Sequence, residues 1–195
     1  MESKISGTFK AVESMRRRGR AARALAALGL LTLTMAGCGG GGGDGEAAAA
    51  AALFVFFSAN DGSSGQELWK TDGTDAGTTR VKNINPGAGD SNPIGFTVFN
   101  GALYFSAIDA AAGRELWKTD GTDAGTVRVK NINPGAGGSQ PQEFTVFNGA
   151  LYFRAFDATA GFELWKSDGT DAGTVRVKDI NPGMGSSSLS ELTPF

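Results

Sequence analysis

The sequence predicts an all-β fold: a β-propeller-like array of four-stranded antiparallel blades with about three repeats of 48 residues. The segment at 67–78, Glu-Leu-Trp-Lys-Thr-Asp-Gly-Thr-Asp-Ala-Gly-Thr, returns unchanged at 115–126 and with one change at 163–174. Residues 96–143 and 144–191 are identical at 37 of 48 positions. Short apolar segments alternate with Asn-Gly and Asp-Gly turns inside each repeat, which is typical of antiparallel strands.

The second repeat shows the four expected strands most clearly. The first, at 96–99, precedes Asn100-Gly101, a strong signal for a two-residue type I′ hairpin. The second and third are expected at 102–108 and 114–118, and the fourth at 126–132. Turns at 109–113 and 120–125 separate the later strands, and a loop rich in Pro and Gly follows at 133–138.

The faces of these strands differ. Strands one to three carry apolar residues on both faces, whereas strand four alternates Val127 and Val129 with Arg128 and Lys130. Propeller blades bury both faces against their neighbours, and their outermost strand meets solvent. We therefore expect the first three strands of each blade to be buried and the fourth to be exposed.

The repeat region divides at about 53–95, 96–143 and 144–191, with a last strand at 192–195, so twelve strands are expected. The first repeat begins at the position of the second strand. Because closed propellers need about four to eight blades, three repeats are too few. Two chains would close a six-bladed ring by self-association, or the chain is part of a longer array. We favour the second interpretation.

Residues 1–37 have the features of a secretory signal peptide, with Met15 as an alternative start. They carry seven Lys or Arg against two Asp or Glu, and the apolar core at 24–35 is too short to span a bilayer comfortably. The run ends in Thr34-Met35-Ala36-Gly37-Cys38, which resembles the lipobox of bacterial lipoproteins. An ordinary secretory signal followed by a chance Cys is the alternative.

The lipobox resemblance implies lipidation of Cys38, an anchor in the membrane, and a place in the bacterial cell envelope. Gly39 after the Cys suggests the outer membrane or the cell surface. Residues 38–52 then form the anchored Cys and a Gly- and Ala-rich linker, which is flexible because Gly offers no side chain to pack.

Composition excludes several classes of function. From Cys38 onward, eleven Lys or Arg face eighteen Asp or Glu, so the exported part has a net charge of −7. Such a charge argues against a nucleic-acid partner, which favours a basic face. The chain has no His, the commonest acid–base group and metal ligand, and its single Cys excludes an intrachain disulfide.

The repeated Glu-Leu-Trp-Lys-(Thr/Ser)-Asp-Gly-Thr motif resembles the ELWxxDGT repeat of bacterial surface and secreted proteins. The resemblance covers residues 53–195 and rests on three copies of a long motif. It implies a propeller-like β-repeat in an exported protein, and it implies no established activity.

Four sets of repeated residues are candidate sites. The tryptophans could present faces to sugars, but their place inside a strand favours packing between blades. The aspartates could bind calcium, although turn formation explains them better. The glutamates could form the carboxylate pair of a glycosidase. The basic residues could attract anionic glycans, but protection of an edge strand is the simpler explanation. These sets are Trp69, Trp117 and Trp165; Asp61, Asp109, Asp157, Asp72, Asp120, Asp168, Asp75, Asp123 and Asp171; Glu67, Glu115 and Glu163; and Arg80, Lys82, Arg128, Lys130, Arg176 and Lys178.

Catalytic residues usually break a repeat, and here only Arg154 and Phe162 stand out in one repeat. Neither suggests a mechanism, so we expect no enzyme activity and no required cofactor. The sequence therefore predicts an exported, lipid-anchored surface protein that acts as a binding or scaffolding module. Its expected partners are the membrane and a surface glycan or protein. A propeller-fold hydrolase acting on glycans and a purely structural surface protein are the alternatives.

Overall fold

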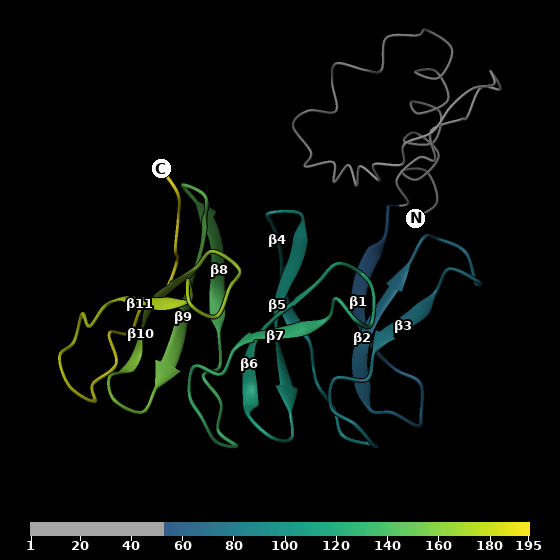
Figure 1. Ribbon diagram of the computed structural model, residues 1–195, viewed down its shortest axis with the longest axis horizontal. Coiled ribbons are helices and arrows are strands. Elements are labelled where there is room, and N and C mark those ends of the chain that lie inside the picture. The colour runs from purple at the N-terminus through teal and green to yellow at the C-terminus, as the bar shows by residue number, and fades with distance from the viewer. Residues whose placement is uncertain (1–52) are drawn as a thin grey trace, which may run out of the picture. The chain divides into compact units, whose positions relative to one another are not determined.

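The computed structural model describes residues 53–195; the signal-peptide, Cys38 and linker predictions fall on residues 1–52 and lie outside the described residues. The described part is all-β, as predicted, and its strands form three antiparallel sheets (Figure 1). These sheets are β1 (Val55–Asn60), β2 (Gln66–Thr71) and β3 (Thr79–Lys82); β4 (Ile94–Phe99), β5 (Ala102–Asp109), β6 (Gly113–Thr119) and β7 (Val127–Lys130); and β8 (Gln142–Phe147), β9 (Ala150–Asp157), β10 (Gly161–Ser167) and β11 (Val175–Lys178).

Each sheet is an up-and-down meander in which neighbours in sequence are neighbours in the sheet. The sheets match the three predicted repeats, and residues 53–195 form no closed propeller or barrel. The same residues include no helix able to cross a membrane. The Asn-Gly hairpins form as predicted: Asn100 has φ 45° and Gly101 φ 73°, so both have the positive φ that a type I′ turn requires.

A bulge recurs between the third and fourth strands of each sheet. In the second sheet Trp117 pairs with Arg128 but Leu116 pairs with Lys130, so Val129 is an extra residue on β7. The equivalent shifts occur between Leu68 and Trp69 and between Leu164 and Trp165. Bulges bend an edge strand and re-aim its side chains. Here the bulge residue Val129 is buried although β7 is an edge strand.

The hydrophobic cores lie between neighbouring sheets. Leu68, Val81 and Ile84 of the first repeat pack against Phe105, Ala107 and Trp117 of the second. The same positions of the second and third repeats form the next core, which consists of Phe99, Tyr104, Leu116, Val129, Ile132, Leu151, Phe153, Ala155 and Trp165. Each repeat is therefore stabilised by the next one, as in other repeat architectures.

The predicted burial of both faces of the first strand is only partly right: Phe99 is buried, but the opposite face is not. In β4 the side chains of Ile94, Phe96 and Val98 are exposed, and Val146 and Phe147 of β8 are exposed too. These strands lie at the edge of their sheets, next to one another, and nothing among the described residues covers their outer face. Burial of this face requires a closed ring, which residues 53–195 do not form.

The expected strand at 192–195 does not form, which leaves eleven strands instead of twelve. The equivalent segments in β4 and β8 pair with the strand that follows the Asn-Gly turn. Residues 192–195 have no such hairpin partner among the described residues. The segment lies beside β8 instead, where the Thr145 hydroxyl donates to the carbonyl oxygen of Leu192 at 2.8 Å.

Candidate functional site

The Asp-Gly-Thr-Asp-Ala-Gly segments form closed networks of hydrogen bonds within the turn. In the second repeat, Oδ1 of Asp120 accepts from the Thr122 backbone N–H at 2.8 Å and from the Thr122 hydroxyl at 2.7 Å. The hydroxyl oxygen of Thr122 in turn accepts from the N–H of Gly125 at 2.9 Å. A side chain at Gly125 would overlap the Asp120 carboxylate. The segment thus requires these residue types for its own conformation.

A pair of hydroxyl groups closes the base of this turn. The hydroxyls of Thr119 and Thr126 lie 2.7 Å apart, and the Thr119 oxygen accepts from the Gly121 N–H at 2.9 Å. In the third repeat Ser167 replaces Thr119 and keeps the same contact with Thr174 at 2.7 Å. The one change within the repeated motif therefore conserves the hydroxyl that the turn needs.

These hydrogen bonds lower the pKa of each turn carboxylate. The Thr122 hydroxyl and backbone N–H hold the pKa of Asp120 below its ordinary value of 3.8, and Thr74 and Thr170 do the same for Asp72 and Asp168. The predicted turn role of these acids is confirmed by this geometry. Residues 53–195 contain no group of three or more Asp, Glu, Cys or His placed to hold a metal ion. Calcium binding, the less favoured alternative for these acids, stays untested.

The glutamate two residues before each tryptophan is a fully buried structural acceptor. Glu115 accepts from the backbone N–H of Ile132 and of Asn133, both at 3.1 Å, and from the Ser139 hydroxyl at 2.5 Å. Burial raises the pKa of Glu115, and the hydrogen bonds oppose that rise. Glu67 and Glu163 bind the equivalent backbone groups at Ile84 and Ile180. No face of these carboxylates is open to a substrate.

The Glu115 network continues into the next repeat. The carbonyl oxygen of Ser139, whose hydroxyl binds Glu115, accepts from the N–H of Phe156 at 2.8 Å. Ser91 links Glu67 to Ile108 in the same way. Sequence reasoning missed this role, because the acceptor and its donors are 17 to 24 residues apart. The recurrence of Ser91, Ser139 and Ser187 at the repeat period was the available signal.

The tryptophans pack between repeats, as predicted. Trp117 and Trp165 are buried in the two cores between sheets, whereas Trp69 of the first repeat is partly exposed. The indole N–H groups of all three donate no hydrogen bond within the described residues. Their contribution is therefore the apolar area that they bury.

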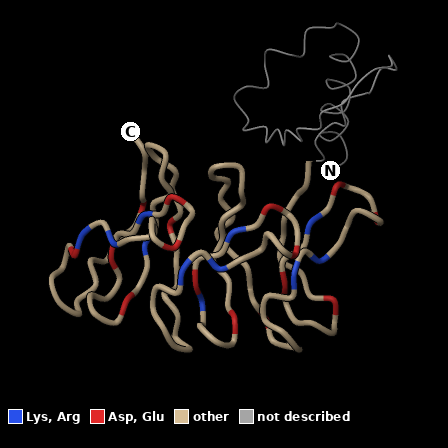
Figure 2. The backbone as a smooth tube through the Cα atoms, viewed as in Figure 1, with Lys and Arg blue, Asp and Glu red and all other residues tan. Residues whose placement is uncertain are grey.

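The basic residues of the fourth strands lie on sheet edges, as expected, but they also form specific ion pairs. Arg80 pairs with Asp61 at 3.0 Å and Arg176 with Asp157 at 2.8 Å, each inside one repeat. Lysines reach the next repeat instead: Lys130 Nζ donates to the Asp171 carbonyl oxygen at 3.0 Å and to its carboxylate at 2.9 Å. Figure 2 shows basic and acidic positions interspersed along all three repeats. The charges therefore offer no separate basic stripe to an anionic ligand.

A second lysine joins the third strand of each of the first two repeats to the following repeat. Lys70 Nζ donates to the carbonyl oxygen of Gly121, and Lys118 Nζ to that of Gly169, both at 2.8 Å. The motif of the second repeat is therefore hydrogen-bonded to both neighbours. Lys118 donates to the third repeat, and Gly121 accepts from Lys70 of the first repeat. A sequence pattern cannot show this contact, because it joins residues 51 positions apart.

An open groove whose lining includes several polar groups lies between the second and third sheets. It has a volume of about 470 Å³ and is lined by Tyr104, Lys118, Asp120, Asp168 and Gly169, among others. The Tyr104 hydroxyl lies so close to Gly169 that a side chain there would overlap it. Burial, and then the nearby charge of Asp168, raise the pKa of Tyr104. In the first repeat Phe56 takes the place of Tyr104.

Two of the residues that differ in the third repeat, Arg154 and Phe162, compensate for one another. Arg154 lies over the ring of Phe162, with its Cζ 4.0 Å from the ring centroid. In the second repeat the arginine is Arg114, which donates to the carbonyl oxygen of Asn92 at 2.9 Å and lies near Ser106. The exchange moves the positive charge from one strand to its neighbour. It creates a cation–π contact.

No family model, curated protein or solved structure matches this chain at a significant level.

The buried glutamates predict a large effect on stability. We expect Glu115→Leu to lower the free energy of unfolding by roughly 3 kcal/mol or more, because two backbone N–H groups and one hydroxyl lose their acceptor. Glu115→Gln, which keeps one oxygen, should cost less. Urea unfolding followed by circular dichroism measures both. The exposed Glu191→Gln is the matched control and should change little; an equal effect at Glu115 and Glu191 would contradict the structural role.

The lowered pKa values of the turn aspartates predict loss of stability in acid. A carboxylate whose pKa is lower in the folded than in the unfolded state contributes stability above its unfolded pKa, and the contribution is lost as pH falls through the folded pKa. Thr122→Val removes the first cause of the shift at Asp120. The variant should therefore lose less stability than the wild type between about pH 5 and pH 2.

Urea titrations at several pH values test this expectation, with Thr122→Ser, which retains the hydroxyl, as the control. The raised pKa of Glu115 acts with the opposite sign, but it is common to all three proteins and cancels in the comparison. If the free energy of unfolding falls equally steeply with pH in Thr122→Val and in the wild type, the Thr122 hydroxyl does not lower the pKa of Asp120, and the expectation is wrong.

Proposed function

We propose that this chain is an exported, lipid-anchored surface protein whose ELWxxDGT-type, propeller-like repeats act as a binding or scaffolding module. The observation that carries the proposal is that the polar side chains of the repeated motif bind other groups of the protein itself. Glutamates, turn aspartates, arginines and lysines of the motif bind backbone groups, neighbouring turns or one another. Side chains committed to holding a fold favour a rigid display surface over a catalytic centre.

The groove between the second and third sheets is the proposed ligand surface. It combines the Tyr104 hydroxyl, the Lys118 ammonium group and the carboxylates of Asp120 and Asp168 within about 470 Å³. Mixed donors and acceptors in a groove of this size suit the hydroxyl groups of a neutral sugar. Two carboxylates in the groove and a net charge of −7 after residue 37 disfavour an anionic glycan.

The lipid anchor is tested by replacing Cys38, the residue that would carry the acyl chain. We expect Cys38→Ala to shift the protein from the membrane fraction to the soluble envelope fraction and to abolish incorporation of labelled fatty acid, since no other Cys is present. Met35→Leu, which restores the residue usual in a lipobox, serves as the control and should stay in the membrane. Fatty-acid labelling that persists in Cys38→Ala would refute the assignment.

The ligand surface is tested on an array of neutral and acidic oligosaccharides. We expect the wild type to favour neutral members and Tyr104→Phe to bind them about 2- to 10-fold more weakly, as the loss of one hydrogen bond implies. The fold tolerates this change, because Phe56 occupies the equivalent position. Met184→Gln, at an exposed loop residue outside the groove, should bind like the wild type. The absence of binding to any oligosaccharide would favour a purely structural protein.

A further inference from the structure

The third repeat exposes the surface that the first two repeats bury against their successors. Val129 is 6% exposed and its equivalent Val177 44%. Ile132 is 7% exposed and Ile180 49%, and Phe99 is 3% exposed and Phe147 40%. In the second repeat these residues pack against the third. The third repeat therefore ends on an apolar face, the C-terminal face, whose composition already fits another repeat.

The first repeat exposes the opposite surface, the N-terminal face. Val55 is 66% exposed, while Leu151 at the same position of the third repeat is fully buried. Phe57 and Trp69 are partly exposed, although their equivalents Phe153 and Trp165 are buried in a core. A side chain built on Gly73 would meet no other atom within 4 Å. One built on the equivalent Gly121 or Gly169 would meet Phe56 or Tyr104 of the preceding repeat.

Polar groups at the two faces are also complementary. Lys166 and Lys178 are exposed in the third repeat, whereas their equivalents Lys118 and Lys130 donate to the Gly169 and Asp171 turn of the next repeat. In the first repeat the Gly73 carbonyl oxygen and Asp75 are the equivalent acceptors. No lysine of residues 53–195 reaches them. The C-terminal face thus offers lysine donors, and the N-terminal face offers the oxygen acceptors that fit them.

We propose that a second copy of this chain docks head to tail, in place of the longer array that the sequence alone favoured. The C-terminal face of one copy covers the N-terminal face of the other, and the reverse contact closes a ring of six blades. The interface would repeat the one already formed twice within the chain. Head-to-tail contacts close into a ring when the rotation per unit allows it. Two copies of three repeats supply six blades, which lies within the usual range of about four to eight.

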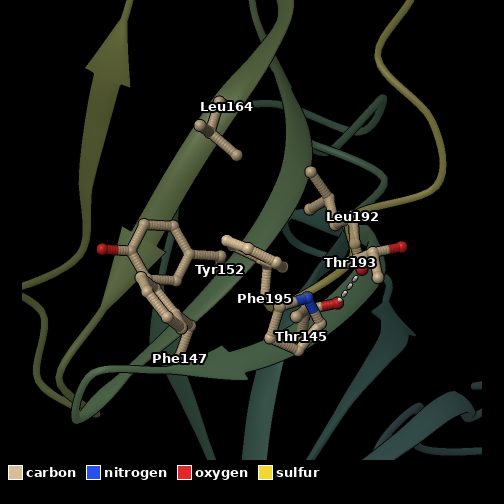
Figure 3. A pocket seen from close by; sticks show the side chains of 8 residues that line it. Thr145, Phe147, Tyr152, Leu164, Leu192, Thr193 and Phe195 are labelled. Atoms are coloured by element: carbon tan, nitrogen blue, oxygen red, sulfur yellow. Dashed lines mark hydrogen bonds between the residues drawn. The ribbon is translucent and has the colours of Figure 1, made fainter.

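Residues 192–195 would complete the partner's first sheet. That sheet has three strands and lacks the innermost one, which β4 and β8 supply in the other sheets. The segment follows the third repeat as β8 follows the second, and it already lies beside β8 through the bond from Thr145 to Leu192. Figure 3 shows Leu192 and Phe195 across from Phe147 and Tyr152, at a groove of about 290 Å³. The proposed dimer places the partner's β1 there.

The register of this added strand follows from the repeat. Val146 pairs with Leu151, so Pro194 would pair with Val55 of the partner. Phe147 and Ala150 flank a two-residue turn and form a hydrogen-bonded pair, which makes the Val146 pair a non-hydrogen-bonded one. The N–H that Pro194 lacks would therefore not be used in the ladder. Proline is tolerated on an edge strand at such a position.

The mass in solution tests the dimer. The full chain with Cys38→Ala, which carries no acyl chains, is purified and sized by light scattering coupled to gel filtration. We expect twice the mass of the chain. Ile180→Glu, which places a charge in the C-terminal face, should give a monomer with unchanged circular dichroism; Met184→Glu, on an exposed loop residue, should remain a dimer. A monomeric parent, or a ladder of larger oligomers, would overturn the closed dimer.

Disulfide cross-linking tests the faces and the register. Val55→Cys and Pro194→Cys are made on separate Cys38→Ala chains, mixed and oxidised. Because opposite residues of a non-hydrogen-bonded pair lie close together, a disulfide-linked heterodimer should form only in the mixture. Met184→Cys mixed with Val55→Cys should give none. A sized dimer that fails to cross-link at Val55 and Pro194 would refute the added strand.

Discussion

A buried carboxylate in the third strand of each repeat holds the rest of the repeat in place. Glu115 accepts from the backbone that leaves the fourth strand and from Ser139, which lies further along the same loop. Buried backbone N–H groups need a partner, and here a side chain provides it where the sheet ends. Because Ser139 also binds the backbone of β9, the same network positions the following sheet. Local conformation and repeat stacking therefore depend on one group.

The sequence predicted the elements of the fold well, because short-range chemistry specifies them. The Asn100-Gly101 hairpin, the Asp120-Gly121 turn and the strands between them follow from backbone preferences that act within a few residues. The exposure of β4 was not predictable in this way. Apolar residues on both faces of a strand indicate that both faces can be buried, but whether they are depends on how many units assemble.

Prediction of the site was weaker for a related reason. Motif spacing identified Glu115, Trp117 and Asp120 as unusual, and each has a defined role in the structure. The spacing could not separate a carboxylate that binds a ligand from one that binds its own backbone, because both need an acid at a fixed position. Burial and donor geometry separate them. The groove beside Tyr104 arises between two repeats, and no pattern inside one repeat contains it.

The hydrogen bonds between repeats have a consequence for how this protein reaches its native state. They join residues 41 and 51 positions apart, and each connects one repeat only to its neighbour. Repeat proteins with such nearest-neighbour contacts can nucleate in any unit and grow by addition. A chain exported unfolded, as proposed for this one, needs no contact between its distant ends before structure begins. Folding can therefore keep pace with the arrival of the chain, one 48-residue unit after another.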